Sequence, residues 1–344
     1  MLKVVSTKSE WDEVISCFDN LDIYYSKEYI DLFAVQENGR VEALFYQDDE
    51  CKIFYPYIVR KIPFENYNYQ DIVTAYGYGG PHLIGNQEKI KKFYELFEEY
   101  CRERNIVTET IRCHPLLCNH QYLEEVMDTN YIRKTTAVNL ENSYEDIFNH
   151  YTSSNKRNIK KALKNGIVVE KVDISKENID IFVNLYKETM DRNYAKEMYY
   201  FDADYFYNQA NETSLYKCYL LFAKYENQII AGVMVLLGKK SQFSHYHLGA
   251  SKTDFLHVRP NNILFDYMIK FCLKKGAKFL HLGGGYSEDD GLFKFKSSFT
   301  ANNHYGYYIG SKIYDEAVYD NLCEVAAKKS SLREGYFPLY RSIL

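Results

Sequence analysis

Several absences in this chain of 344 residues limit what kind of protein it can be. None of its eight cysteines belongs to a Cys-x-x-Cys pair, and scattered cysteines are typical of reduced, mostly buried thiols in a cytoplasm. No run approaches the roughly 18 apolar residues that a membrane-spanning helix needs. The first residues are not followed by the apolar segment of a secretory signal peptide. We therefore expect a cytoplasmic protein without a membrane span.

The sequence also lacks a strong excess of charge and any low-complexity segment. A formal net charge of −5 and a pI near 6.0 argue against a general nucleic-acid coat, although they leave room for a local basic groove. Apolar residues make up 46% of the chain, enough for a full hydrophobic core. The length fits two domains or one large one.

Signatures of several enzyme classes are missing as well. The sequence shows no Walker-type phosphate loop and no Ser-His-Asp arrangement. The only metal-like cluster contains Cys113, His114, Cys118 and His120. Because no second ligand pair has matching spacing, we expect no metal site there.

Hydrophobic patterning predicts the same order of elements twice along the chain. In the first half, a hairpin, a strand, a helix and a strand are expected at 41–47 with 52–59, 71–75, 87–104 and 106–111. In the second half, the same elements are expected at 219–224 with 228–237, 242–248, 262–275 and 279–282. The repeat predicts an α/β protein of two similar units, each built on a mixed sheet.

A basic helix is expected between the two halves, at 155–164, with Gly166 as its stop signal. We expect Ile159, Ala162 and Leu163 to face the protein. The helix carries five cations and no acid within nine residues: Lys156, Arg157, Lys160, Lys161 and Lys164. Such a run is usually a solvated helix face. Since most of the chain mixes its charges, we interpret this stretch as a phosphate-binding element for a sugar nucleotide or an RNA backbone.

The segment 283–299 carries the strongest functional signal. An apolar strand at 279–282 leads into Gly283, Gly284 and Gly285, which Tyr286 follows. An acidic turn comes next, and then Lys294 and Lys296 among phenylalanines. Glycines at a strand end allow a substrate to approach the backbone closely. A lysine with little water around it stabilises an oxyanion or a phosphate better than a surface lysine does. The alternative is a loop with core phenylalanines and solvated lysines.

The ordered set of these segments resembles the Fem family (FemABX-like) of the GNAT superfamily. The segments that carry the resemblance are Trp11, 23–29, 54–60, 76–81, 155–164, 247–251 with 260–261, and 283–285 with 295–299. Members of this family are aminoacyltransferases that build peptidoglycan bridges.

The resemblance implies an α/β (α+β) fold of tandem GNAT-like domains, each a mixed, mostly antiparallel sheet with flanking helices. The first domain is expected at 1–148, with 312–344 packing back on it, and the second at 149–311. The implied activity transfers an aminoacyl group, typically from aminoacyl-tRNA, to an amine of a nucleotide- or lipid-linked cell-envelope precursor. Peripheral membrane association would follow from a lipid-linked acceptor, and no cofactor is implied.

The family's phenylalanine–lysine pair falls on Phe295 and Lys296, the expected catalytic residues. The residues expected to bind substrate are Lys156, Arg157, Lys160, Tyr246, His247, Gly283, Gly284, Gly285, Tyr286, Tyr76 and Gly80. Many bridge-forming members have an aspartate three residues after a Gly-Pro pair, but here Pro81 is followed by His82-Leu83-Ile84. The acceptor is therefore left open between a peptidoglycan and a polysaccharide precursor.

Acyl transfer to an amine needs an oxyanion donor and a route for a proton. Lys296 suits the first role, or it holds the donor's phosphate. For the second role, the sequence offers an acidic turn or a histidine on the strand 242–248. Alternatively, a phosphate or the leaving hydroxyl of the substrate accepts the proton. His245 and His247 are expected on one face of that strand and Tyr246 on the other, since strand residues alternate. The acidic turn consists of Glu288, Asp289 and Asp290.

Two other functions stay open at this point. One is an N-acyltransferase that uses an acyl-CoA or acyl-carrier donor on an amino sugar. The turn Arg259-Pro260-Asn261-Asn262 disfavours it, because it lacks the glycines whose N–H groups hold a CoA pyrophosphate, and proline has no N–H. The other is a non-catalytic module whose 35 tyrosines include rings that stack on sugars or RNA bases.

Overall fold

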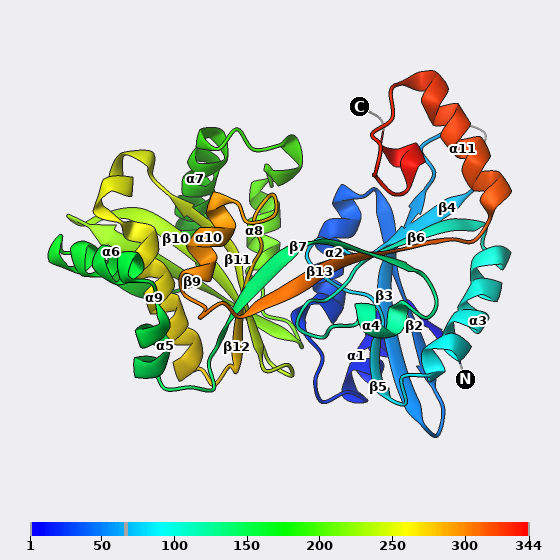
Figure 1. Ribbon diagram of the computed structural model, residues 1–344, viewed down its shortest axis with the longest axis horizontal. Helices are drawn as coiled ribbons and strands as arrows, with labels where there is room; N and C mark the ends of the chain where they lie inside the picture. The colour runs from blue at the N-terminus through cyan, green and yellow to red at the C-terminus, as the bar shows by residue number, and fades with distance from the viewer. Residues whose placement is uncertain (1, 65–67, 343–344) are drawn as a thin grey trace. The chain divides into compact units, whose positions relative to one another are not determined.

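The computed structural model describes residues 2–64 and 68–342, and the chain divides into two compact units (Figure 1). Unit 1 contains Met1–Phe18, Lys27–Arg133 and Gly306–Leu344, and unit 2 contains Asp19–Ser26 and Lys134–Tyr305. These limits differ from the domain boundaries expected after residues 148 and 311, which stay a prediction. Across the described ranges, no helix combines the length and the apolar character needed to cross a membrane.

Unit 1 is built on a mixed sheet with the strand order β1-β2-β3-β4-β6-β13, and β5 pairs with β3. Its pairs are antiparallel except β4 with β6, which are parallel. The elements are β1 Leu2–Val5, α1 Lys8–Ser16, α2 Lys27–Gln36, β2 Gly39–Gln47, β3 Cys51–Lys61, β4 Gln70–Val73, β5 His82–Gly85, α3 Lys89–Glu103, β6 Ile106–Arg112, α4 His120–Leu123, α11 Glu316–Lys329 and the short η4 Leu339–Arg341.

Unit 2 is built on a mixed sheet with the order β7-β12-β11-β10-β9-β8. Here too one neighbouring pair is parallel, β11 with β12, and the others are antiparallel. The elements are η1 Ile23–Tyr25, α5 Tyr144–His150, α6 Ser153–Lys164, β8 Val168–Val172, α7 Lys176–Arg192, η2 Glu197–Tyr199, α8 Ala203–Gln209, β9 Tyr216–Tyr225, β10 Gln228–Gly238, β11 Phe243–Ser251, η3 Thr253–Val258, α9 Pro260–Lys274, β12 Phe279–Gly283 and α10 Gly291–Ser297.

The expected fold class is confirmed, and so is the repeated order of elements. In unit 1, the hairpin β2–β3 is followed by β4, α3 and β6; in unit 2, the hairpin β9–β10 is followed by β11, α9 and β12. In both units the helix connects the two parallel strands, as a parallel connection requires. The observed bounds lie within a few residues of the expected ones.

Two long strands belong partly to each unit, and the sequence did not predict either. β7 (Asp128–Asn139) begins in unit 1, and its later residues pair with β12 in unit 2. β13 (His304–Ile313) begins in unit 2, and its later residues pair with β6 in unit 1. Each sheet is therefore completed by a strand from the other half of the sequence.

The helices cover the sheets through alternating residues. In unit 2, Val233 and Leu221 belong to the core cluster that contains the apolar face of α9. On the other face, Phe222 and Gly232 lie against Phe182 of α7, where a side chain at position 232 would overlap with both rings. The amphipathic helix α3 covers one face of the unit 1 sheet in the same way.

Candidate active site around Lys296

The lysine-containing segment forms a short helix, α10, rather than a loop. Asp290 is its N-cap: its side chain accepts hydrogen bonds from the backbone N–H groups of Phe293 (2.8 Å), Tyr286 (2.6 Å) and Ser287 (3.1 Å). Burial would raise the pKa of this carboxyl, but the backbone donors lower it below its usual value. Asp290 is therefore an ionised structural group and not a general base.

Gly285 is needed for this cap. A Cβ atom at position 285 would overlap with the Asp290 carboxylate, so only glycine lets the carboxylate lie against the backbone here. Gly283 has a φ of +76°, in the left-handed region that glycine adopts without strain. The glycines thus fix the turn that places α10.

Lys296 is buried, with 6% of its surface exposed. Its Nζ donates a hydrogen bond to the carbonyl oxygen of Gly284 (2.8 Å) and lies 5.2 Å from the centroid of the Tyr246 ring. The carbonyl and the ring face are neutral groups that attract a cation. The prediction that this ammonium is withdrawn from bulk water is confirmed, and the alternative of a solvated lysine is wrong at this position.

Phe295 points into the core next to Lys296. Its ring lies 5.0 Å from that of Phe265 and 5.4 Å from that of Phe299, in edge-to-face contacts. Phe265 also packs against Tyr246, the ring below Lys296 (4.9 Å). Phe295 therefore supports the platform that holds Lys296.

The remaining residues of the turn have structural partners or are exposed. Glu288 and Asp289 each form an ion pair with Lys134, at 3.1 and 3.0 Å. Tyr286 is 56% exposed, and its ring lies 6.1 Å from that of Tyr199. Tyr286, Glu288 and Asp289 are all exposed, and the two carboxylates are paired with Lys134.

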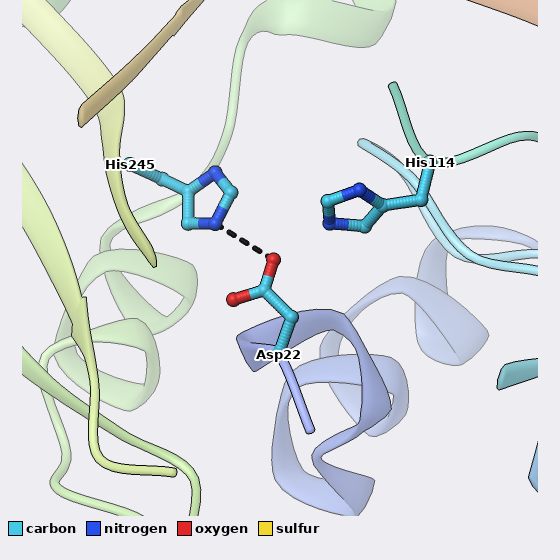
Figure 2. Close-up of side chains that lie close together, drawn as sticks. All are labelled: Asp22, His114 and His245. Carbon is cyan, nitrogen blue, oxygen red and sulfur yellow. Dashed lines mark hydrogen bonds and ion pairs between the residues drawn. The ribbon is translucent and has the colours of Figure 1, made fainter. Parts of the chain in front are cut away.

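His245 on β11 is buried and hydrogen bonded to Asp22, the N-cap residue of η1. Figure 2 shows this pair, in which Nε2 of His245 lies 2.8 Å from a carboxylate oxygen of Asp22. The other ring nitrogen, Nδ1, lies 3.4 Å from the hydroxyl of Tyr24. Because Asp22 can only accept, Nε2 carries the proton, and Nδ1 accepts from Tyr24. Both ring nitrogens are thus engaged in the fold.

His247 has a different environment. Its Nε2 lies 2.6 Å from the hydroxyl of Tyr205 on α8. Burial, with a smaller contribution from His245, lowers the pKa of His247 to about 3, so this imidazole is neutral at physiological pH. A bulge in the pairing of β10 with β11 falls at His247, which breaks the simple alternation expected for this strand.

The basic helix α6 is anchored directly to α10. The backbone N–H of Thr152, which is the N-cap of α6, donates to the carbonyl of Ser298 at the end of α10 (3.1 Å). Asn155 adds a side-chain hydrogen bond to the same carbonyl (3.5 Å) and accepts one from Asn262 of α9 (2.8 Å). The first turn of α6 therefore lies beside the helix that carries Lys296.

The cations of α6 differ in their surroundings. Lys156 donates to the Asn149 carbonyl (2.7 Å) and lies over the Phe148 ring, whereas Arg157 and Lys160 are exposed. Within the ranges that the structure describes, none of the five α6 cations forms an ion pair. The expectation that Leu163 faces the protein is wrong: it is 58% exposed, because the buried stripe of this short helix is narrower and contains Ile159 and Ala162.

Tyr76 and Gly80, two of the residues expected to bind substrate, belong to unit 1. The carbonyl of Tyr76 accepts from the Tyr29 hydroxyl (3.0 Å). Gly80 has a φ of +93°, and a Cβ there would crowd Ile111 and Asn119. Asn119 in turn donates to the Gly79 carbonyl (2.8 Å). These contacts account for Gly80 through packing, and a role in substrate binding stays a prediction.

The cysteine–histidine cluster also lies in unit 1, and its members contact neighbouring groups of that unit. His114, which Figure 2 also draws, accepts at Nδ1 from the backbone N–H of Leu117 (3.3 Å). His120 stacks on the Tyr308 ring at 3.9 Å, and Cys118 contacts the Pro115 carbonyl.

The turn before α9 has the form that disfavours CoA. Arg259 occupies the left-handed region with a φ of +67°, and Pro260 is the first residue of the helix. The proline removes one N–H at the point where a pyrophosphate would need donors.

Comparisons with known proteins agree with this geometry. A model of the FemAB-like family, described as peptidoglycan biosynthesis/recognition, matches residues 47–333. No curated protein sequence matches the chain significantly. Among solved structures, FemX is similar with 15% identity and a TM-score of 0.68, over 93% of this chain and 99% of that one.

Two further structures share the fold. The C-terminal domain of a putative lysylphosphatidylglycerol synthetase from Agrobacterium fabrum has 12% identity and a TM-score of 0.53, over 94% of this chain and 97% of that one. A tandem GNAT protein from the clavulanic acid pathway has 7% identity and a TM-score of 0.50, over 92% and 99%. The family resemblance seen in the sequence is thereby confirmed, and the chain belongs to the FemAB-like family.

Proposed function

We propose that this protein transfers an aminoacyl group from aminoacyl-tRNA to an amine of a cell-envelope precursor, with Lys296 as the group that stabilises the reaction's oxyanion. Family membership makes the chain an acyltransferase of cell-envelope synthesis. The observation that carries the assignment of the site is the buried ammonium of Lys296, which donates to the Gly284 carbonyl and lies over the Tyr246 ring, on a helix that is hydrogen bonded to the exposed cationic helix α6.

A cation in such a place suits the chemistry of acyl transfer. The acceptor amine attacks the ester carbonyl of the donor, a C–N bond forms, and the carbonyl oxygen becomes an oxyanion. An ammonium in surroundings with little water stabilises that charge far more than a solvated one does. The intermediate then collapses, the C–O bond to the tRNA ribose breaks, and the amide product leaves.

The proton lost by the amine ends on the ribose oxygen of the leaving tRNA. Neither histidine of β11 suits the role of base. His245 has both nitrogens engaged by Asp22 and Tyr24, and a pKa of about 3 makes His247 a poor proton acceptor. Direct transfer to the leaving oxygen balances the reaction without a protein base.

The helix α6 is suited to hold the phosphates of the donor. Arg157 and Lys160 are exposed cations on a helix whose first turn is hydrogen bonded to the end of α10. Phosphate contacts of this kind supply sequence-independent affinity for RNA and make it salt-dependent. The same helix would serve a nucleotide-linked or lipid-linked acceptor less well, because those ligands present only one or two phosphates.

The acceptor class is a nucleotide- or lipid-linked peptidoglycan or polysaccharide precursor. The family description supports a cell-envelope acceptor. A lipid-linked acceptor would bring the protein to the cytoplasmic membrane surface as a peripheral protein. Cytoplasmic location follows from the need for charged tRNA.

The test is a pair of donor assays on the purified protein. With a mixture of precursors from a bacterial envelope, transfer of radiolabelled amino acid from charged tRNA is expected, without release of CoA thiol from acyl-CoA. Thiol release without transfer from tRNA would overturn the proposed donor and favour the acyl-CoA reaction. The absence of both, together with saturable binding of glycan or RNA, would show a binding module instead.

A variant of α6 tests the phosphate role separately. The double change Arg157→Gln with Lys160→Gln is expected to raise the KM for charged tRNA about tenfold, to leave kcat nearly unchanged, and to reduce the salt dependence of binding by roughly one to two phosphate contacts. Lys164→Gln, at the far end of the same helix, is the matched control. An equal effect of the control would contradict a contact centred on the first turns.

A further inference from the structure

A cavity of about 210 Å³ in unit 1 has no role in the reaction described above. Its lining includes Arg60 on β3 together with Thr110 and Arg112 on β6. Thr110 alternates with Ile111, which belongs to the core beneath α3, so the cavity lies on the opposite face of this sheet. Asn130 and Tyr336, both exposed, lie at its rim. The cavity is therefore lined by cationic side chains and also by residues that are exposed to solvent.

The charges around the cavity do not balance. Arg60 donates to Asp71 (2.7 Å) and Glu37 (2.6 Å), and Arg341 also binds Asp71. Arg112 donates to the Thr74 carbonyl (2.5 Å), and within residues 2–64 and 68–342 it forms no ion pair.

Three arginines thus share two carboxylates, which leaves one positive charge in excess. The Arg112 guanidinium has N–H groups beyond the one that binds Thr74. Burial raises the pKa of Glu37, but Arg60 and, to a smaller extent, Arg112 lower it below its usual value. The excess charge is therefore located at Arg112.

Thr110 provides an independent sign of a missing partner. The residue is 8% exposed, and its hydroxyl has no hydrogen-bond partner among the described residues. A buried hydroxyl left in this state destabilises a fold, and most such groups are satisfied. A hydroxyl can donate a hydrogen bond to an oxyanion, and a guanidinium attracts one. The unpaired Thr110 hydroxyl and the excess charge at Arg112 therefore both favour an anionic ligand.

A neighbouring groove restricts which anion fits. This groove, of about 800 Å³, shares Ser311 and Phe337 with the cavity, and six carboxylates and two lysines line it. Its charge repels a ligand with several negative charges, such as a diphosphate or a nucleic acid, and attracts an ammonium. A single oxyanion on a small molecule meets both conditions.

We propose that the cavity lined by Arg60, Thr110 and Arg112 binds the carboxylate of a small ligand that carries one negative charge, and that a ligand with an ammonium as well is preferred. Its carboxylate accepts from Arg112 and Thr110, while its ammonium lies toward the acidic groove. This site differs from the proposed tRNA contact, which requires many phosphates.

Isothermal titration calorimetry on the full chain tests the proposal with three probes at one ionic strength: glycylglycine, acetate and pyrophosphate. Saturable binding is expected for glycylglycine and acetate, with glycylglycine tighter and pyrophosphate at least about tenfold weaker than either. The absence of saturable binding for both carboxylates would overturn the proposal. Tighter binding of pyrophosphate would overturn the single-charge assignment.

Variants locate the binding. Thr110→Val keeps the shape, removes the unpaired hydroxyl, and is expected to weaken acetate binding about tenfold while the melting temperature stays the same or rises. Arg112→Met is expected to abolish measurable binding. The control Arg40→Met removes an exposed charge of the same unit that does not line the cavity, and should change affinity less than about twofold.

Unchanged binding in both Thr110→Val and Arg112→Met would exclude this cavity as the site. Because Arg112→Met also removes the bond to Thr74, its melting temperature is measured alongside. The outcome is independent of the proposed function, since transfer from charged tRNA is assayed separately with the same variants.

Discussion

Among the residues that the structure describes, each unit buries one lysine or arginine, and the groups around the two cations give them different roles. Arg60 in unit 1 is held by two carboxylates, Asp71 and Glu37, at 2.7 and 2.6 Å. Lys296 in unit 2 is held by a backbone carbonyl and the face of Tyr246. Carboxylates neutralise a guanidinium and tie strands together, whereas a carbonyl dipole and a ring face attract an ammonium without carrying a net charge themselves.

The two units share a frame but differ in what they do with it. Both use a hairpin followed by a parallel strand–helix–strand connection. In unit 1 the buried carboxylate of Glu109 is bound by the hydroxyls of Tyr94 and Tyr314 (3.1 and 2.6 Å). In unit 2 the end of the second parallel strand opens into the glycine turn that positions Lys296. One frame thus serves stability in unit 1 and the proposed chemistry in unit 2.

The largest effect is expected from breaking the neutralised cation. Asp71→Ala leaves Arg60 buried with one carboxylate fewer and removes the acceptor of the Tyr340 hydroxyl (2.9 Å). The free energy of unfolding should fall by about 3–5 kcal/mol, because one partner of a buried ion pair is removed and Arg60 and Arg341 keep only Glu37, among the described carboxylates, near them. Chemical denaturation measures this, with Asp49→Ala in an exposed turn as control. A loss below about 1 kcal/mol would show that the pair does not organise unit 1.

Removal of the other buried cation should affect activity instead. Lys296→Met is expected to lower kcat for acyl transfer by about 100- to 1000-fold, since an oxyanion donor is lost, with little change in the melting temperature. Lys294→Met, on the exposed side of the same helix, should keep full activity. If Lys296→Met turned over at the wild-type rate, the assignment of the site would be withdrawn.

The glycine turn links the frame of unit 2 to its site. Gly285→Ala displaces the Asp290 cap of α10 and should reduce the free energy of unfolding by about 1–2 kcal/mol, with a parallel fall in activity as Lys296 shifts. Gly291→Ala is the matched control, because a Cβ at 291 meets no neighbour within 4 Å. Equal losses in both variants would point to a general effect of alanine on the helix.

The smallest effect concerns the pH dependence of unit 1. Burial raises the pKa of Glu109, and the hydroxyls of Tyr314 and Tyr94 only partly oppose this. A carboxyl with a raised folded pKa contributes stability at low pH that is lost as the pH rises from about 4.5 through the folded value.

Glu109→Gln should therefore remove this decline, and the unfolding free energy of the variant minus that of the wild type should increase as the pH rises across that range. Denaturation curves at a series of pH values measure it, and exposed Glu103→Gln should leave the wild-type profile unchanged. A wild-type stability that instead rises above pH 4.5 in step with Glu109 would reverse the sign of the argument.

Local patterns carried much of the prediction. The spacing of Ile90, Phe93, Tyr94 and Phe97 marked α3, because side chains three and four apart share one helix face. Leu163 was misplaced by the same rule, since a helix of three turns buries only the centre of its apolar stripe. The short helix α10 was missed because its capping contact depends on Gly285, whose role is visible only when Asp290 is placed.

Local patterns in the sequence were enough to predict the repeated units, the family and the burial of Lys296, because each depends on short segments and their order along the chain. The folded structure was needed to show that β7 pairs with β12 and β13 with β6, that Asp22 binds His245, and that Thr110 and Arg112 line one cavity. Those contacts join residues far apart in sequence. Hydrogen bonds and charges are satisfied by whatever the fold brings near, and no local pattern records which distant group that is.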